Sequence, residues 1–188
     1  IRASVAAKSN VTYKILYNDA VAMTGGQPAE GALTAEQIVR ELIVEGVSPV
    51  VLVSEDPTRF SPADLPPGTR VLHRDRLDEV QRELRDLKGT SAIVYEQTCA
   101  NEKRRRRKRG DYPNPDKRLF INTAVCEGCG DCSVQSNCLS VAPVETEFGR
   151  KRAIDQSTCN KDYSCVKGYC PSFVEVQGGT LVKRSLDD

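Results

Sequence analysis

The sequence lacks the features of a membrane or secreted protein. No apolar run approaches the roughly 18 residues that a membrane-spanning helix requires. No signal peptide is recognisable at the start, and no cysteine precedes Cys99, which argues against a small disulfide scaffold. We therefore expect a cytoplasmic protein without a membrane partner, large enough for one medium domain or two small ones.

Histidine is almost absent, and charge is unevenly distributed. His73 is the only histidine, and we interpret it as a strand-edge residue rather than a catalytic base. The net charge is +1, but Lys103–Arg109 is a run of seven basic residues, so the rest of the chain carries −6. We interpret this basic run as a solvated connector, or as a docking site for an acidic protein or for phosphate groups. Nucleic-acid binding is disfavoured because no aromatic residue interrupts the run.

Cysteine is concentrated in one region, with seven of the eight cysteines between Cys126 and Cys170. Cys126, Cys129 and Cys132 have the C-x2-C-x2-C spacing with which bacterial ferredoxin motifs begin, and Cys170-Pro171 supplies their Cys-Pro ending. This spacing predicts ligands of an iron–sulfur cluster and places neighbouring cysteines too close for easy mutual disulfide pairing. A zinc-binding module that uses the basic run to bind nucleic acid is an alternative.

A second, incomplete half-motif follows. Cys159 and Cys165 flank Asp162, which stands where the middle cysteine of C-x2-C-x2-C should be. Because a carboxylate holds iron less firmly than a thiolate, the second cluster would be a 4Fe-4S cluster with aspartate or water at one iron, or a 3Fe-4S form. The alternative is that Asp162 is a surface acid. The last cysteine of each half ligates the other cluster in two-cluster ferredoxins, which predicts two ligand sets: Cys126, Cys129, Cys132 and Cys170 for one, and Cys138, Cys159, Cys165 and Asp162 for the other.

The first part of the chain alternates strand and helix patterns. Apolar runs at 50–53 and 92–95 predict buried parallel strands, and 13–17 predicts a further strand. Helices are predicted over 34–46, beginning with a capping box and ending at a glycine, and over 75–89. This alternation predicts an α/β layer. Three strands make a thin layer, so we expect a piece of a larger protein.

The last part of the chain has the pattern of two strands joined by a turn. Residues 172–176 predict a strand, followed by a glycine turn and a returning strand over 180–183. The proline-rich stretch 55–67 is predicted to be irregular. No internal repeat is apparent beyond the two cysteine half-motifs.

A family resemblance rests on four segments: Asn18–Gln27 with its Thr-Gly-Gly-Gln, Tyr95–Glu102, the basic run and Cys126–Cys132. Together they resemble indolepyruvate ferredoxin oxidoreductases, thiamine-diphosphate enzymes of the 2-oxoacid:ferredoxin oxidoreductase family, in their long fused bacterial form. The resemblance covers essentially all 188 residues. It implies three parts: the C-terminal part of a thiamine-diphosphate-binding parallel-sheet domain (1–97), a basic connector (98–118) and a ferredoxin-like α+β iron–sulfur domain with two clusters (119–188).

The resemblance also implies a site for thiamine diphosphate and Mg2+. Asn18 would offer a side-chain oxygen to the metal and Ala20 a main-chain carbonyl, in keeping with the oxygen ligands that Mg2+ prefers. Thr24, Gly25 and Gly26 would lie close to the cofactor. Without the resemblance, Asn18 is a strand-end turn residue and the glycines form a flexible loop.

The implied reaction is the oxidative decarboxylation of aryl 2-oxo acids such as indolepyruvate to acyl-CoA and CO2, with electrons passing to ferredoxin. Cys99 would help to bind a further cluster, or it is a free thiol. Glu96, which follows a buried strand, could lie near the cofactor. The family's Gly-Asp-Gly motif and the domain that binds the aminopyrimidine are absent here, so we expect this chain to need the remaining domains of a parent chain. The alternative is a standalone ferredoxin-like electron carrier.

Overall fold

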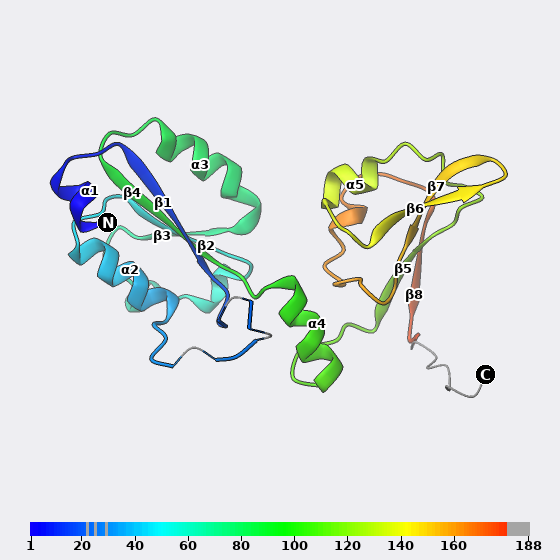
Figure 1. The fold of residues 1–188 in the computed structure, drawn as a ribbon, viewed down its shortest axis with the longest axis horizontal. Helices are drawn as coiled ribbons and strands as arrows, with labels where there is room; N and C mark the ends of the chain where they lie inside the picture. The colour runs from blue at the N-terminus through cyan, green and yellow to red at the C-terminus, as the bar shows by residue number, and fades with distance from the viewer. Residues whose placement is uncertain (22, 25, 29, 180–188) are drawn as a thin grey trace. The chain divides into compact units, whose positions relative to one another are not determined.

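The computed structural model describes residues 1–21, 23–24, 26–28 and 30–179, and these divide into two compact units (Figure 1). The first unit runs from Ile1 to Glu102, and the second begins at Lys103. The strand predicted over 180–183 lies outside the described residues. In the described part of the chain, no helix is both long enough and apolar enough to cross a membrane.

The first unit contains a sheet of four parallel strands in the order β1-β4-β2-β3. The prediction of an α/β layer is therefore confirmed. The prediction of only three strands is wrong, because β3 is an additional short strand that pairs with β2 alone and has exposed ends. The strand bounds are β1 (Val11–Tyr17), β2 (Val50–Ser54), β3 (Arg70–His73) and β4 (Thr90–Glu96).

The helices of this unit are α1 (Arg2–Ala6), α2 (Ala35–Val44) and α3 (Leu77–Arg85). The predicted capping box of α2 is present, since the Thr34 side chain accepts from the Gln37 amide and the Gln37 side chain accepts from the Thr34 amide. Gly46 follows the helix in the left-handed conformation, with a φ of 89°. Glycine adopts this conformation without steric cost, which explains why α2 stops here.

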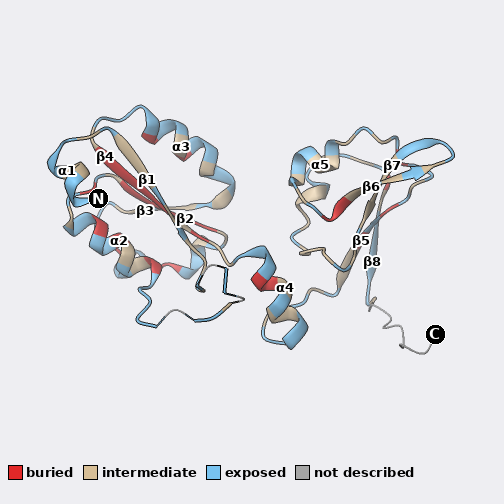
Figure 2. Cartoon of the chain, viewed as in Figure 1, coloured by how far each residue is buried: buried red, intermediate tan, exposed pale blue. Residues whose placement is uncertain are grey.

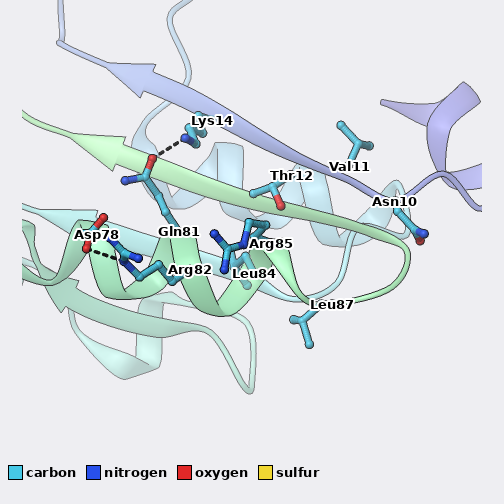
Figure 3. Close-up of a pocket in the computed structure, with 10 residues that line it drawn as sticks. All are labelled: Asn10, Val11, Thr12, Lys14, Asp78, Gln81, Arg82, Leu84, Arg85 and Leu87. Atoms are coloured by element: carbon cyan, nitrogen blue, oxygen red, sulfur yellow. Dashed lines mark hydrogen bonds and ion pairs between the residues drawn. The ribbon is translucent and has the colours of Figure 1, made fainter.

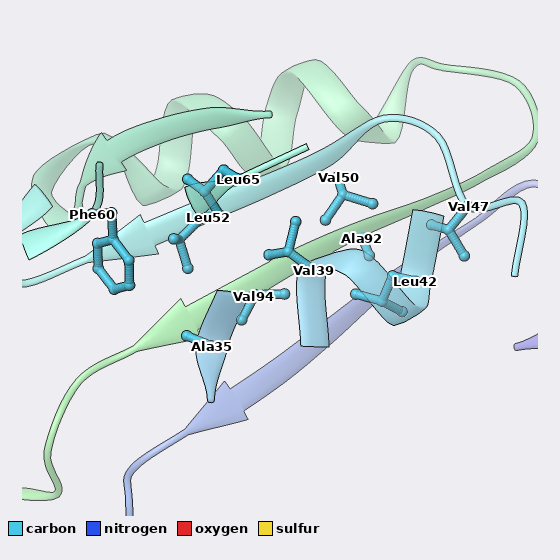
Figure 4. Close-up of a cluster of buried hydrophobic side chains, with 10 residues drawn as sticks. All are labelled: Ala35, Val39, Leu42, Val47, Val50, Leu52, Phe60, Leu65, Ala92 and Val94. Carbon is cyan, nitrogen blue, oxygen red and sulfur yellow. The ribbon is translucent and has the colours of Figure 1, made fainter. Parts of the chain in front are cut away.

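The core lies on both faces of the sheet, with α2 covering one face and α3 the other (Figure 1). Side chains alternate between faces along a strand, so neighbouring valines of β2 face different helices. The interior of β2 and β4 is the most deeply buried part of the unit (Figure 2). Each fully buried valine or leucine contributes about 1.5–3 kcal/mol. The cluster against α2 (Figure 4) consists of Ala35, Val39, Leu42, Val47, Val50, Leu52, Phe60, Leu65, Ala92 and Val94, and the cluster against α3 of Val51, Val53, Val80, Leu84 and Ile93.

The second unit is built from two small antiparallel sheets. Strand β5 pairs with β8, and β6 pairs with β7 as a hairpin. The predicted strand over 172–176 is confirmed as β8, and among the described residues it pairs with β5. The bounds are β5 (Lys117–Ile121), α5 (Asp131–Ser136), β6 (Val141–Thr146), β7 (Gly149–Ile154), a 3-10 turn (Ser164–Val166) and β8 (Phe173–Gln177).

The basic run lies within a helix, α4 (Ala100–Arg109). Arginine and lysine are good helix formers, so the run favours a helix although it has no apolar stripe. Lys103 is only 6% exposed, which does not fit a fully solvated connector. Arg104 and Arg107 donate hydrogen bonds to the main chain of residues 158 and 160.

Candidate metal centre

Two cysteine-bearing segments of the second unit have the same backbone structure. We call residues 122–132 the first cysteine loop and residues 155–165 the second. Each begins with a residue, Asn122 or Asp155, whose side chain accepts a hydrogen bond from the amide two residues later, at 3.0 and 2.8 Å. The carbonyl of the same residue accepts from the amide of the first cysteine, at 2.9 and 3.1 Å. The two loops therefore form a structural repeat.

The repeat continues through the cysteines. In each loop the first cysteine sulfur accepts a hydrogen bond from the amide two residues later, that of Gly128 or Lys161, at 3.4 Å in both loops. These two residues are in the left-handed region, with φ of 72° and 52°. Gly130 and Tyr163 are in it as well, with φ of 83° and 58°. This conformation is uncommon for a residue with a side chain, so its recurrence at corresponding positions marks a shared loop geometry.

Each loop is also bound in the same way to the residue that precedes a strand, Ser172 before β8 and Ser140 before β6. The amide of Asn122 donates to the carbonyl of Ser172, and the amide of Asp155 donates to that of Ser140, both at 2.8 Å. Both serines are only 2% exposed. The repeat therefore includes the strand contacts as well as the loops, and extends further than the cysteine half-motifs of the sequence indicate.

Within this repeat, Asp162 stands at the position of Cys129. Both are exposed, and each is followed by a left-handed residue and by a cysteine three positions on. Asp162 Oδ1 accepts from the amide and hydroxyl of Ser164 at 3.2 and 3.0 Å. The carboxylate thus replaces a thiol at the centre of the second loop.

One cavity brings together all four predicted ligands of the second set, namely Cys138, Cys159, Cys165 and Asp162. Cys138 comes from the end of the first half of the unit, yet it lies with the cysteines of the second loop. The enclosed space is about 10 Å³, room for about one water molecule, so a cluster would have to displace these side chains outward.

The first set is partly assembled. Cys126 is buried together with Ile121 and Val141, and Cys132 packs against this small core. Cys129 is exposed, and the Cys170 sulfur lies 3.0 Å from the hydroxyl of Ser172. The structure therefore brings Cys126 and Cys132 of the predicted first set to one apolar cluster, to which Cys138 and Cys165 of the second set also belong. Cys129 and Cys170 are not members of it.

The buried thiols are held in their neutral form. Burial raises the pKa of Cys165 to about 11, with the nearby Cys159 adding to the effect, and burial also raises the pKa of Cys132. Iron binds the thiolate, so metal binding here must release protons. All eight cysteines are free thiols. Among the described residues, no group of three or more His, Cys, Asp or Glu side chains is arranged to hold a metal ion.

Charged side chains crowd around the second loop. The Lys161 Nζ donates to Asn114 Oδ1 at 2.8 Å and to the carbonyl of Pro115 at 2.6 Å. Burial lowers the pKa of Lys161, and the positive charges of Arg118 and Arg107 lower it further. This part of the unit therefore has an excess of positive charge.

In the first unit, polar residues gather at the carboxyl ends of the strands. Glu96 is 6% exposed, and its carboxylate accepts from Ser54 Oγ at 2.6 Å and from Arg59 Nη1 at 2.9 Å. Ligands of open parallel sheets bind at this edge. Burial raises the pKa of Tyr17, which ends β1 here, and Asp19 and Glu96 raise it further.

The residues predicted to bind thiamine diphosphate follow β1 at the same edge. Asn18 Oδ1 accepts a hydrogen bond from the amide of Ala20 at 3.3 Å. This interaction is expected if Asn18 is a strand-end turn residue. The Thr24 hydroxyl donates to the carbonyl of Val21 at 2.8 Å and accepts from the amide of Gln27. These hydrogen bonds stabilise the loop itself.

The structure gives a steric reason for a glycine at position 26. Its φ is 93°, and a Cβ added there would lie 2.1 Å from an Oε atom of Glu102. The glycine thus allows close approach of a carboxylate of its own unit. Gly25 lies outside the described residues. Cys99 is exposed in the segment between β4 and α4.

A pocket of about 500 Å³ lies between β1 and α3 (Figure 3). It is lined by Asn10, by the first half of β1, including Thr12 and Lys14, and by charged residues of α3. Lys14 donates to Gln81 across it. The pocket is at the amino-terminal half of β1, away from the edge that carries Asn18 and Glu96.

The sequence interpretation missed Ser54 and Arg59, and it did not recognise Asn122 and Asp155 as loop-forming residues. A signal existed for the last two, since an Asn or Asp stands four residues before the first cysteine of both half-motifs. Arg59 lies in the irregular proline-rich stretch and has no comparable signal. Comparisons with protein-family models, curated proteins and solved structures found no match to this chain.

Proposed function

We propose that this chain is part of a thiamine-diphosphate-dependent 2-oxoacid:ferredoxin oxidoreductase of the indolepyruvate type, and that its second unit is the electron exit of that enzyme. The parent protein would convert an aryl 2-oxo acid and coenzyme A into an acyl-CoA and CO2. The observation that carries the proposal is the repeat of the two cysteine loops, together with the cavity that joins Cys138 to the second loop.

The repeat supports a ferredoxin-like unit with two clusters. The chain runs strand, cysteine loop, helix or 3-10 turn, and strand, and then does so again. The first strand pairs with the last, and the two middle strands pair with each other. Cys138 belongs to the first half in sequence but lies with the thiols of the second half. Each half would therefore supply its last cysteine to the other cluster, as in two-cluster ferredoxins.

The weak apolar core of this unit points the same way. Its buried hydrophobic residues are few: Leu119, Ile121, Cys126 and Val141. Domains of this size with so small a core usually need disulfides or metals to be stable. Four free thiols, those of Cys126, Cys132, Cys138 and Cys165, lie in or against this small core, so bound clusters would supply the missing stabilisation.

The donor set fits iron–sulfur chemistry, which when bound supplies one-electron transfer. The loop amides that donate to Cys126 and Cys159 would stabilise negative charge on the ligand sulfurs, and such hydrogen bonds tune the potential. Asp162 would hold its metal less firmly than Cys129, because it offers a hard oxygen. The second set is therefore the more open to loss of one iron.

The thiamine part of the proposal rests on the family resemblance and on position. Asn18, Ala20 and Glu96 lie at the carboxyl edge of a parallel sheet, where an oxygen donor could reach Mg2+ and phosphate. On the edge strand β1, Leu16 is 76% exposed on the face of the sheet that carries α3, and it is not among the side chains that pack against that helix. We propose that further parts of the parent chain cover this strand and complete the cofactor site.

Anaerobic reconstitution of the chain with iron and sulfide tests the proposal. We expect a brown protein with absorbance near about 400 nm that bleaches on reduction and yields a paramagnetic signal. The isolated chain should not decarboxylate indolepyruvate in the presence of thiamine diphosphate and Mg2+. A colourless product would refute the electron-transfer proposal, and turnover would refute the need for further domains.

A further inference from the structure

A basic pocket lies beside the second cysteine loop and is not explained by the proposed electron transfer. Five cationic side chains line it, together with the Cys159 thiol, and no carboxylate does. Its volume is about 200 Å³. The cations come from α4, β5 and the second loop: Arg104, Arg107, Lys108, Arg118 and Lys161.

The cations are held in place by neutral groups. Arg107 donates to the carbonyls of Pro113 and Asn160, and Arg118 donates to the carbonyl of Gly179 at 3.1 Å. Lys161 donates to a carbonyl and an amide oxygen. Over the described residues, Arg107, Arg118 and Lys161 form no ion pair with a carboxylate. Arg107, Arg118 and Lys161 are therefore held in place by main-chain and amide oxygens rather than by carboxylates.

Such an arrangement favours an anion. A guanidinium has five N–H donors in a planar fork that matches phosphate, and Arg107 uses two of them on the main chain. The amide nitrogen of Asn114 is also available, because the Lys161 bond uses its oxygen. A docking protein would need about 800 Å² of surface, whereas a concave pocket of this size suits a single small group.

We propose that the basic pocket binds a phosphoryl group of a small molecule. The proposal does not depend on the presence of clusters, since every group that it uses belongs to the protein. Because Cys159 lines the same pocket, the bound anion would lie next to a residue to which we also assign metal binding.

Calorimetric titration of the full chain with inorganic pyrophosphate at low ionic strength tests this inference, and it is done on the reconstituted protein, whose fold the clusters would stabilise. We expect saturable binding of one pyrophosphate, weakened about tenfold or more in the double variant Lys108→Gln/Arg118→Gln. Neither substitution touches the contacts through which Arg104 and Arg107 hold the second loop. The matched control is Arg82→Gln/Arg85→Gln on α3, which removes the same charge from the first unit and should leave binding unchanged.

Equal weakening in both double variants would reduce the effect to net charge and overturn the proposal. So would the absence of saturation in the wild-type chain. A glutamate-rich peptide that binds more tightly than pyrophosphate would also overturn it, by assigning the surface to an acidic protein partner. Circular dichroism of each variant confirms that the fold is retained before binding is compared.

Discussion

The two cysteine loops differ in sequence far more than in backbone structure. Both start with an Asx turn, both donate an amide to the first sulfur, and both contain two left-handed residues at the same positions. The first loop uses Gly128 and Gly130 there, whereas the second uses Lys161 and Tyr163. The comparison teaches that hydrogen bonds and local conformation fix the loop, while Cys129 or Asp162 decides the chemistry at its centre.

The largest effect should come from adding a methyl group to the first loop. A Cβ on Gly128 would lie 2.3 Å from the carbonyl oxygen of Arg150, so Gly128→Ala must move the loop or the hairpin. We expect a destabilisation of at least about 1–3 kcal/mol and a reconstituted protein with roughly half the iron. Denaturant unfolding and iron analysis measure both effects.

Two controls separate the causes. Lys161 is at the corresponding position of the second loop and already has a Cβ. The Lys161→Ala protein should therefore keep its iron. Gly149→Ala tests left-handed strain alone, because no atom lies within 4 Å of the added Cβ. A Gly128→Ala protein with unchanged iron content would show that the two loops do not depend on their conformation in the way described.

If the last cysteine of each half ligates the cluster of the other half, substitution of Cys138 and substitution of Cys170 should remove different clusters. Cys138→Ala should remove the cluster of the second loop and Cys170→Ala that of the first, because each cysteine is assigned to the other half. Paramagnetic resonance of each reduced variant would show which signal is lost. Loss of the same signal in both variants, or of the second-loop signal in Cys170→Ala, would contradict the crossed arrangement.

Exchange of the central ligands gives a smaller, spectroscopic effect. Asp162→Cys should give the second loop four thiolates, change its resonance spectrum and slow its loss of iron to a chelator, since thiolate holds iron more firmly than carboxylate. Cys129→Asp should make the first cluster as labile as the second. An unchanged spectrum in Asp162→Cys would count against Asp162 as a ligand.

The smallest expected effect is a pH dependence of the metal-free chain. The pKa of Cys165 is about 11 in the fold against an ordinary value of 9.0, so the unfolded chain loses this proton first as pH rises. The contribution of Cys165 to the stability of the fold should therefore be constant below about pH 9 and fall between about pH 9 and 11. Urea midpoints across this range should fall less steeply in Cys165→Ala, and identical slopes would contradict the assignment.

Part of this structure could be predicted from the sequence. The apolar runs of β2 and β4 predict buried parallel strands, and the Thr34 capping box predicts the start of α2. These patterns are contained within each element's own residues. Strand β3 and the β6–β7 hairpin were missed, since their strands have few apolar side chains and form through pairing with a neighbouring strand. Helix α4 was missed because it has no apolar face.

The candidate site could likewise be predicted only in part from the sequence. Spacing alone placed Asp162 at the position of a cysteine, and the backbone of the second loop agrees with it. The joining of Cys138 to the second loop followed from the ferredoxin pattern. The basic pocket could not be predicted, because Arg107, Arg118 and Lys161 converge only through the folding of α4, β5 and the second loop.

The central claim is that the two cysteine loops bind inorganic clusters, and the iron and acid-labile sulfide content of the anaerobically reconstituted chain tests it most directly. The account predicts about eight sulfide ions per chain and about eight iron ions, or about seven if the second cluster is a three-iron form. A folded chain that takes up neither element, or that binds zinc in their place, would contradict it.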